Sequence, residues 1–298
     1  MNISDYLKSW PLYVLPHHLI SRGVFKLTRI RSPLVPRVIR WFSKVFKVNL
    51  DEAVNPEPES YATFNEFFTR PLKPELRPLT QEANALASPV DGAVSQFGSI
   101  SAGRIMQAKN HDYSVLELVG GNQQYADWFK DGQFMTIYLS PRDYHRIHMP
   151  LDAQLLKQIY VPGRLFSVAG HTARTIPRLF ARNERVVTLF DTDFGKMAMV
   201  LVGAINVAAI ETVWDGLITP PNGKMIAEKS YTDLDQPKRY HKGEEMGRFN
   251  MGSTVIILLE RPADFLAEKS NAEAVVKLGE KLAEFHGKEH EKISPRKH

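Results

Sequence analysis

Short apolar runs, each bounded by glycine, proline or aspartate, dominate the chain from residue 85 to about residue 259. Runs of this length, rich in β-branched and aromatic residues, are typical of strands. We therefore expect strands at residues 134–139, 154–161, 185–190, 196–202, 206–214 and 254–259, and short helices at 123–130 and 177–182. The segments between the strands are too short for repeated βαβ crossovers. The pattern predicts an α+β fold whose body is mainly antiparallel β.

A different pattern fills residues 1–50, which prolines divide into two or three short amphipathic helices. The clearest helix begins near Ser32 and Pro33, and Pro36 leaves its start open by a few residues. Its large apolar residues, among them Trp41 and Phe42, fall on one face, and its charges fall on the opposite stripe. Such a helix either lies in a membrane interface or packs its apolar face on the protein body. The sequence leaves both alternatives open.

Charge separates the same segment from the rest of the chain. Residues 1–50 hold nine lysines and arginines but a single acid, Asp5, so this segment carries +8, the remainder carries −3 and the whole chain +5. We call residues 1–50 the arm. A basic arm indicates an anionic partner surface. Its cations stand beside large aliphatic and aromatic residues, which favours a lipid surface over nucleic acid.

The domain organisation follows from these patterns. We expect a membrane-association arm at 1–50, a proline-rich and acidic linker and packing segment at 51–87, and a β-rich catalytic body at 88–298. Residues 272–285 read either as a helix interrupted by Gly279 or as a strand near Val275, and the charged tail after Gly287 is expected to fray.

Composition removes several function classes. The chain has no cysteine, so disulfides, thiolate catalysis and cysteine-ligated zinc are excluded. No apolar run approaches 18 residues, and we expect no membrane span and no secretory signal.

The first chemically suggestive stretch is Gly252-Ser253, directly before the apolar run at 254–259. Glycine gives steric access to the peptide bond before Ser253, and a buried strand would hold the serine rigidly. This arrangement suits a hydroxyl that attacks its own preceding carbonyl. The alternative is an ordinary turn at the start of a core strand.

Two further polar spots accompany it. Asp91 stands at a turn in SPVDG, and His145 and His148 follow a predicted strand in YLSPRDYHRIHMP. Asp91, a histidine and Ser253 form an acid–base–nucleophile set, because such sets are defined by geometry and not by chain order. The histidine pair lacks a third metal ligand in any recognisable motif, so we expect no metal.

Several long motifs, in order, resemble a known family. These motifs are FNEFFTRP at 64–71, SPVDG at 88–92, YLSPRDYHRIHMP at 138–150, LFARNERV at 179–186, ETVW at 211–214 and GRFNMGSTV at 247–255. Together they resemble the bacterial membrane-bound, pyruvoyl-dependent phosphatidylserine decarboxylases. One departure is Met251, where leucine is commoner in that family; the swap conserves volume.

The resemblance implies a proenzyme that cuts itself between Gly252 and Ser253 into chains 1–252 and 253–298. It makes Ser253 the nucleophile, His148 its general base and Asp91 the residue that orients the base. His145 is then expected to contact the substrate carboxylate or return a proton to the α-carbon. Arg142 and Arg146 are open as phosphate ligands or structural residues, and the division of roles between His145 and His148 is also open.

The resemblance further implies a pyruvoyl group made from Ser253, which forms a Schiff base with the substrate amine and takes up the electrons left by CO₂, as pyridoxal phosphate does. No pyridoxal phosphate and no metal are expected. The implied partners are phosphatidylserine and an anionic membrane surface, not nucleic acid, with the enzyme peripheral on the cytoplasmic face of the cell membrane. A homodimer of the processed unit is compatible with these expectations.

Three alternatives stay open on the sequence alone. The chain could instead be a pyruvoyl-dependent decarboxylase of a soluble amino acid, a Ser-His-Asp hydrolase with an uncut Ser253, or a non-enzymatic membrane-binding module. The basic arm argues against the first.

Overall fold

The computed structural model describes residues 3–108, 111–205, 209–220, 223–269, 271 and 273–286. Its helices are α1 Ile3–Ser9, α2 His17–Leu27, α3 Val35–Phe46, α4 Phe64–Phe68, α5 Val115–Leu118, α6 Gln123–Phe129, α7 Gly170–Thr175 and α8 Leu179–Arg182. Its strands are β1 Ala85–Ala87, β2 Gly92–Ser99, β3 Arg104–Ala108, β4 His111–Ser114, β5 Gln133–Leu139, β6 Arg146–His148, β7 Ala153–Val161, β8 Arg185–Thr192, β9 Gly195–Val202, β10 Ile210–Thr212, β11 Gly216–Thr219, β12 Ala227–Ser230, β13 Arg239–Tyr240, β14 Glu245–Phe249, β15 Ser253–Leu259, β16 Asp264–Phe265, β17 Val275–Val276 and β18 Lys281–Glu284.

The body is built on one large antiparallel sheet with the strand order β12-β7-β8-β9-β15-β5-β2-β17, and β13 also pairs with β7. Strand β15 lies near its middle, bonded to β5 on one side and to β9 on the other. Two smaller sheets, β11-β10-β14-β6 and β1-β18-β16, and the β3-β4 pair complete the body. The predicted α+β fold with an antiparallel β body and short N-terminal helices is confirmed.

The strands predicted from apolar runs are found close to their expected bounds. Five of the six correspond to β5, β7, β8, β9 and β15. The sixth, expected at 206–214, is observed only as β10, and residues 206–208 lie outside the described residues. The helices expected at 123–130 and 177–182 are α6 and α8. The predictions succeed because buried strands read as continuous β-branched runs.

The ambiguous C-terminal segment forms strands β17 and β18 rather than a helix. Gly279 between them has φ +84°, and a Cβ there would lie 2.7 Å from the carbonyl oxygen of Pro78. Glycine is therefore required at this turn. The predicted charged tail after Gly287 lies outside the described residues.

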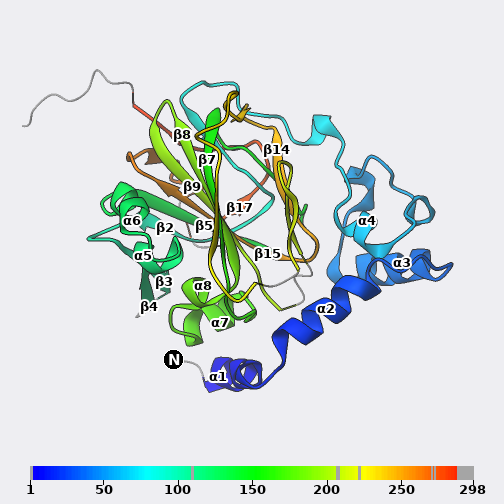
Figure 1. The fold of residues 1–298 in the computed structure, drawn as a ribbon. Coiled ribbons are helices and arrows are strands. Elements are labelled where there is room, and N and C mark those ends of the chain that lie inside the picture. Colours follow the sequence, from blue (N-terminus) through cyan, green and yellow to red (C-terminus); the bar gives the residue numbers. More distant parts are fainter. Residues whose placement is uncertain are drawn as a thin grey trace, which may run out of the picture.

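The helices of the arm lie along the β body (Figure 1, blue). Ser9 bonds to Thr175 of α7 at 2.7 Å, and Asp5 pairs with Arg174 at 3.0 Å. Further along, Nε2 of His18 lies 2.9 Å from the carbonyl oxygen of Gly163. The arm is thus tied to the segment at 163–175 by polar contacts.

Helix α3 divides its apolar residues between two directions. Val35, Ile39 and Phe42 are buried in a cluster with Phe67 and Phe68. Other apolar residues of the helix region are exposed: Leu34, Val38, Trp41 and Val45. One apolar stripe therefore packs on the body, and a neighbouring stripe faces outward.

Candidate active site

The connection between β14 and β15 contains the bond singled out in the sequence. We call residues 250–252 the scissile segment; Ser253, which follows it, is the first residue of β15. Backbone bonds hold the approach to it, because the amide of Phe249 donates to the carbonyl of His145 and the amide of Asn250 to that of Ala209, both at 2.9 Å. Ser253 is paired with Leu139 of β5. The bond thus lies where a loop meets the central strand.

His145 faces this bond. Its ring is fully buried, and a Cβ built on Gly252 would lie 3.7 Å from its Nε2. Nδ1 lies 2.8 Å from the carbonyl oxygen of Asp143, so Nδ1 carries the proton and donates it. Nε2 then presents a buried lone pair, which has no hydrogen-bond partner among the residues that the structure describes. The ring of Phe68 packs against the imidazole at a tilt of 41°, with the ring centroids 4.1 Å apart.

Burial also sets the charge of His145. Loss of hydration and the nearby positive charge of Arg70 lower the pKa of His145 to about 3. At neutral pH the imidazole is therefore unprotonated, as a base must be before it accepts a proton.

His148 is bound differently. Nδ1 lies 2.7 Å from the carbonyl oxygen of Gly243 and must donate to it, while Nε2 accepts from the hydroxyl of Tyr144 at 3.2 Å. Burial lowers the pKa of His148 and raises that of Tyr144 to about 12, so both are neutral at pH 7. Both ring nitrogens of His148 are thus already engaged.

Asp91 is held by an arginine that the sequence did not single out. Arg77 Nε lies 2.9 and 3.1 Å from the two Asp91 oxygens, and Arg77 Nη2 also reaches Glu52 at 2.6 Å. The carboxylate further accepts from the amide of Leu278 at 2.8 Å. The turn of Asp91 is next to His148, whose amide bonds to Pro89 at 2.9 Å. Among the described residues, however, Asp91 forms no hydrogen bond to either histidine.

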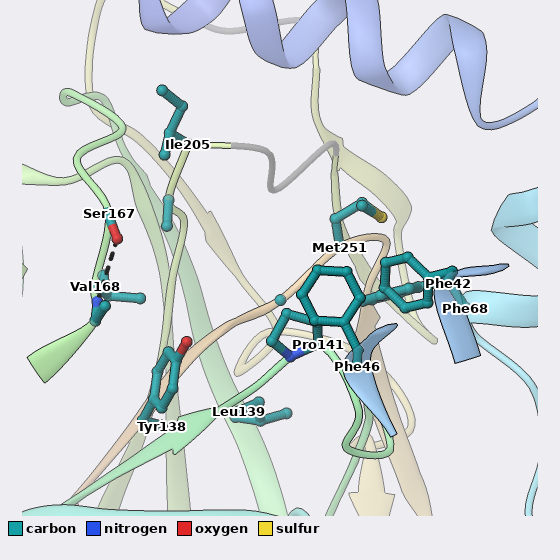
Figure 2. A pocket seen from close by; sticks show the side chains of 13 residues that line it. Phe42, Phe46, Phe68, Tyr138, Leu139, Pro141, Ser167, Val168, Ile205 and Met251 are labelled. Carbon is teal, nitrogen blue, oxygen red and sulfur yellow. Dashed lines mark hydrogen bonds between the residues drawn. The ribbon is translucent and has the colours of Figure 1, made fainter. Parts of the chain in front are cut away.

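An apolar cavity of about 240 Å³ opens beside Gly252. It is lined by Phe42, Phe46, Phe68, Tyr138, Leu139, Pro141, Ser167, Val168, Ala169, Ala204, Ile205, Met251 and Gly252. Figure 2 shows the three phenylalanine rings gathered near Met251, with Ser167 and Val168 across from them. Two of these rings, Phe42 and Phe46, come from α3, so the arm forms part of the cavity wall.

The two arginines left open by the sequence have different surroundings. Arg146 donates to the carbonyl of Thr69 and to Glu245, both at 2.9 Å, which are structural contacts. The side chain of Arg142 is 57% exposed and lies 3.8 Å from Asp143. Sequence reasoning missed Phe68 and the carbonyl of Asp143 as supports of His145, although both lie inside quoted motifs.

The residues present fit a pyruvoyl group made from Ser253. A free imidazole nitrogen faces the residue before the serine, and an open cavity adjoins that residue. Within the described residues, no group of three or more histidines or carboxylates is placed to hold a metal ion.

Comparison with known proteins shows the family of the chain. The family model described as phosphatidylserine decarboxylase matches residues 64–284, and a second, described as PSD, matches residues 7–47. A phosphatidylserine decarboxylase proenzyme of Alkalilimnicola ehrlichii is 55% identical over 261 residues, covering 87% of this chain and 90% of the relative. Proenzymes of the same name from Idiomarina loihiensis and Shewanella putrefaciens are each 52% identical, covering 95% of this chain and 97% and 99% of their own lengths.

These matches show that the chain is a decarboxylase that is made as a proenzyme. The chain belongs to the phosphatidylserine decarboxylase family.

Proposed function

We infer that this chain is a proenzyme that cuts itself at Gly252-Ser253 and then converts phosphatidylserine to phosphatidylethanolamine through a pyruvoyl group at Ser253. Family membership supports the overall reaction. The observation that carries the residue assignment is the free, buried Nε2 of His145 beside Gly252.

In this proposal His145 is the base of self-cleavage, in place of the His148 assigned from sequence. A base needs an unoccupied lone pair directed at the proton it removes. Among the described residues, Nε2 of His145 has no hydrogen-bond partner and lies beside Gly252, whereas Nε2 of His148 already accepts from Tyr144. The low pKa makes His145 a weak base, which is sufficient for a reaction that each chain performs once.

The self-cleavage reaction needs only groups of the chain and one water molecule. His145 takes the Ser253 hydroxyl proton, the oxygen attacks the Gly252 carbonyl carbon, and the C–N bond breaks as the proton passes to the serine nitrogen. This leaves an ester. Loss of the Ser253 Cα proton expels the Gly252 carboxylate from Cβ and leaves dehydroalanine. Tautomerisation and water then release ammonia and leave the pyruvoyl group.

The pyruvoyl group supplies the electron sink for loss of CO₂. The protein holds it in place because Ser253 begins β15, which is hydrogen-bonded to β5 and β9 along its length. Strands β17 and β18 of the same C-terminal chain pair with β2 and β1. The two chains of the cut protein therefore stay together without a covalent link.

Asp91 has a supporting role in the proposal. Its carboxylate, paired with Arg77, adds negative charge near His148 and joins the linker to the turn before β2. The cytoplasmic location and the homodimer stay predictions.

The arm supports action at a membrane surface. Its outward stripe includes Leu34 and Trp41, which are 55% and 62% exposed, beside exposed cations such as Arg37 and Lys44. An apolar stripe flanked by cations suits a helix lying at an anionic interface. Among the described residues, no helix is both long and apolar enough to cross a bilayer.

A matched pair of histidine variants tests the assignment. Denaturing mass spectrometry should find two chains, 1–252 and 253–298, in the wild type and in His148→Ala, but one full-length chain in His145→Ala and Ser253→Ala. The reverse result for the two histidines would return the base role to His148. An active wild type with an uncut Ser253 would leave a hydrolase as the better interpretation.

The substrate class is tested separately on the cut protein. Release of CO₂ should be seen with phosphatidylserine in vesicles and should be absent with free serine. Equal release from both would favour a decarboxylase of soluble amino acids.

A further inference from the structure

One basic residue of the arm contacts the scissile segment directly. Nη2 of Arg29 donates to Oδ1 of Asn250 at 3.0 Å and lies 3.6 Å from Oε1 of Glu211. The side-chain Nδ2 of Asn250 donates to the same Glu211 oxygen at 2.9 Å. Arg29, Asn250 and Glu211 thus form a closed triangle, two residues before Gly252.

The surroundings of Arg29 differ from those of the other arm cations. The other eight are exposed, all within the described residues, and Arg40 pairs with Glu59 at the surface. The Arg29 side chain is only 29% exposed, and its guanidinium lies 3.7 Å from the centroid of the Phe25 ring. Its burial lowers its pKa. A cation that serves only to attract a membrane has no reason to be desolvated against the body.

Asn250 is the first residue of the scissile segment and is anchored on both sides. Its side chain is fully buried, and its amide bonds to Ala209. The preceding residue, Phe249, bonds to the carbonyl of His145, and the following residue, Met251, packs on the apolar cluster that contains Phe42. The direction of the Gly252 carbonyl relative to Nε2 of His145 therefore depends on where Asn250 is anchored.

We propose that Arg29 is a positioning residue for self-cleavage, which acts through Asn250 to hold the Gly252 carbonyl in line for attack. The arm then serves the cut as well as the membrane. The inference rests on the proposed self-cleavage at Gly252-Ser253. Misplacement of a reacting group by about 1 Å can cost about a hundredfold in rate, so the contact is expected to matter although it is remote from the bond.

The test compares Arg29→Met with the matched control Arg31→Met, an exposed cation two residues away. Methionine keeps the apolar stem and removes the donors. The full-length proteins are made by cell-free synthesis, and the uncut fraction is followed in time by denaturing mass spectrometry. We expect at least tenfold slower cutting in Arg29→Met and wild-type cutting in Arg31→Met. Equal rates in Arg29→Met and wild type would overturn the proposal.

Two further readouts separate positioning from general structure. In an Asn250→Ala background, Arg29→Met should slow the cut no further, whereas additive effects would contradict a role through Asn250. Once cut, Arg29→Met should release CO₂ at the wild-type maximal rate per cut chain. A comparable loss of the CO₂ release rate would contradict a role confined to cleavage.

If Arg29→Met does not fold, Arg29→Lys provides a second variant that keeps one donor and should cut at an intermediate rate. A wild-type rate of cutting in Arg29→Lys would count against the proposal. A wild type that never cuts would instead overturn the proposed function itself.

Discussion

The arm and the central sheet use similar apolar residues but place them differently. Every residue from Val255 to Leu259 in β15 is at most 3% exposed. The strand lies between β5 and β9, and its side chains belong to the main hydrophobic core. In α3, Phe42 is 7% exposed while its neighbour Trp41 is 62% exposed. A helix packed on one side buries one stripe and leaves the next uncovered. The difference shows that the arm has two separate surfaces: one lines the cavity beside Gly252, and the other is exposed and is the surface that we propose meets a membrane.

The inner surface of the arm is expected to give the largest effect. Phe42→Ala should lower the free energy of unfolding by about 3–5 kcal/mol, because it removes a buried aromatic ring from the cluster with Phe67 and Phe68. It should also slow the cut, since Phe42 lines the cavity beside Gly252. Denaturant unfolding and the uncut fraction measure the two effects. A change below 1 kcal/mol would mean that the arm is only loosely joined to the body.

The central sheet provides the contrasting variant. Ile257→Ala should lower the free energy of unfolding by about 2–5 kcal/mol, because the residue is fully buried between β5 and β9. Binding of the Ile257→Ala variant to anionic vesicles should be the same as that of the wild type. A parallel loss of vesicle binding would contradict the separation of the two surfaces.

A pH series tests the site where the two regions meet. An ordinary histidine with a pKa of 6.5 would lose base activity about tenfold for each pH unit below that value. Because burial lowers the pKa of His145 to about 3, the rate of cutting should stay nearly constant from pH 8 to pH 5. The unfolded chain binds this proton near pH 6.5, so stability should fall as pH drops from 6.5 towards 3. A fall in cutting rate centred near pH 6.5 would contradict the buried base.

The outer surface is tested by the neighbour of Phe42. Trp41→Ala should leave the free energy of unfolding within about 0.5 kcal/mol, as exposed substitutions usually do. It should weaken binding to phosphatidylserine vesicles by about 1.5–3 kcal/mol, the value of burying a large apolar side chain. Vesicle sedimentation measures this. Unchanged vesicle binding would leave the outer stripe without the proposed role.

Single exposed cations should have the smallest effect. Arg37→Gln is expected to weaken binding to anionic vesicles by about 1 kcal/mol and to leave cutting unchanged. The effect should disappear at high salt, because exposed charges are screened. The same loss on neutral vesicles would point to altered packing of α3 instead of electrostatic attraction.

Sequence reasoning reached much of the fold and supplied the candidate site residues. The strands, the amphipathic arm and the cut at Gly252-Ser253 were all expected, because apolar periodicity and local motifs are readable along the chain. It did not separate the two stripes of α3. Periodicity reports that a face is apolar, but it does not report what covers that face.

The roles of the polar residues depended on contacts between distant segments. The sequence by itself determined the family motifs and so made Asp91, two histidines and Ser253 the candidate site residues, because residue type and motif spacing are local properties. Only the tertiary structure decided that His145 faces Gly252, and that Arg77 holds Asp91. It alone brought Arg29 to Asn250, 221 residues away. Side chains three residues apart can point to different partners, and only the packed fold determines which partner each one meets.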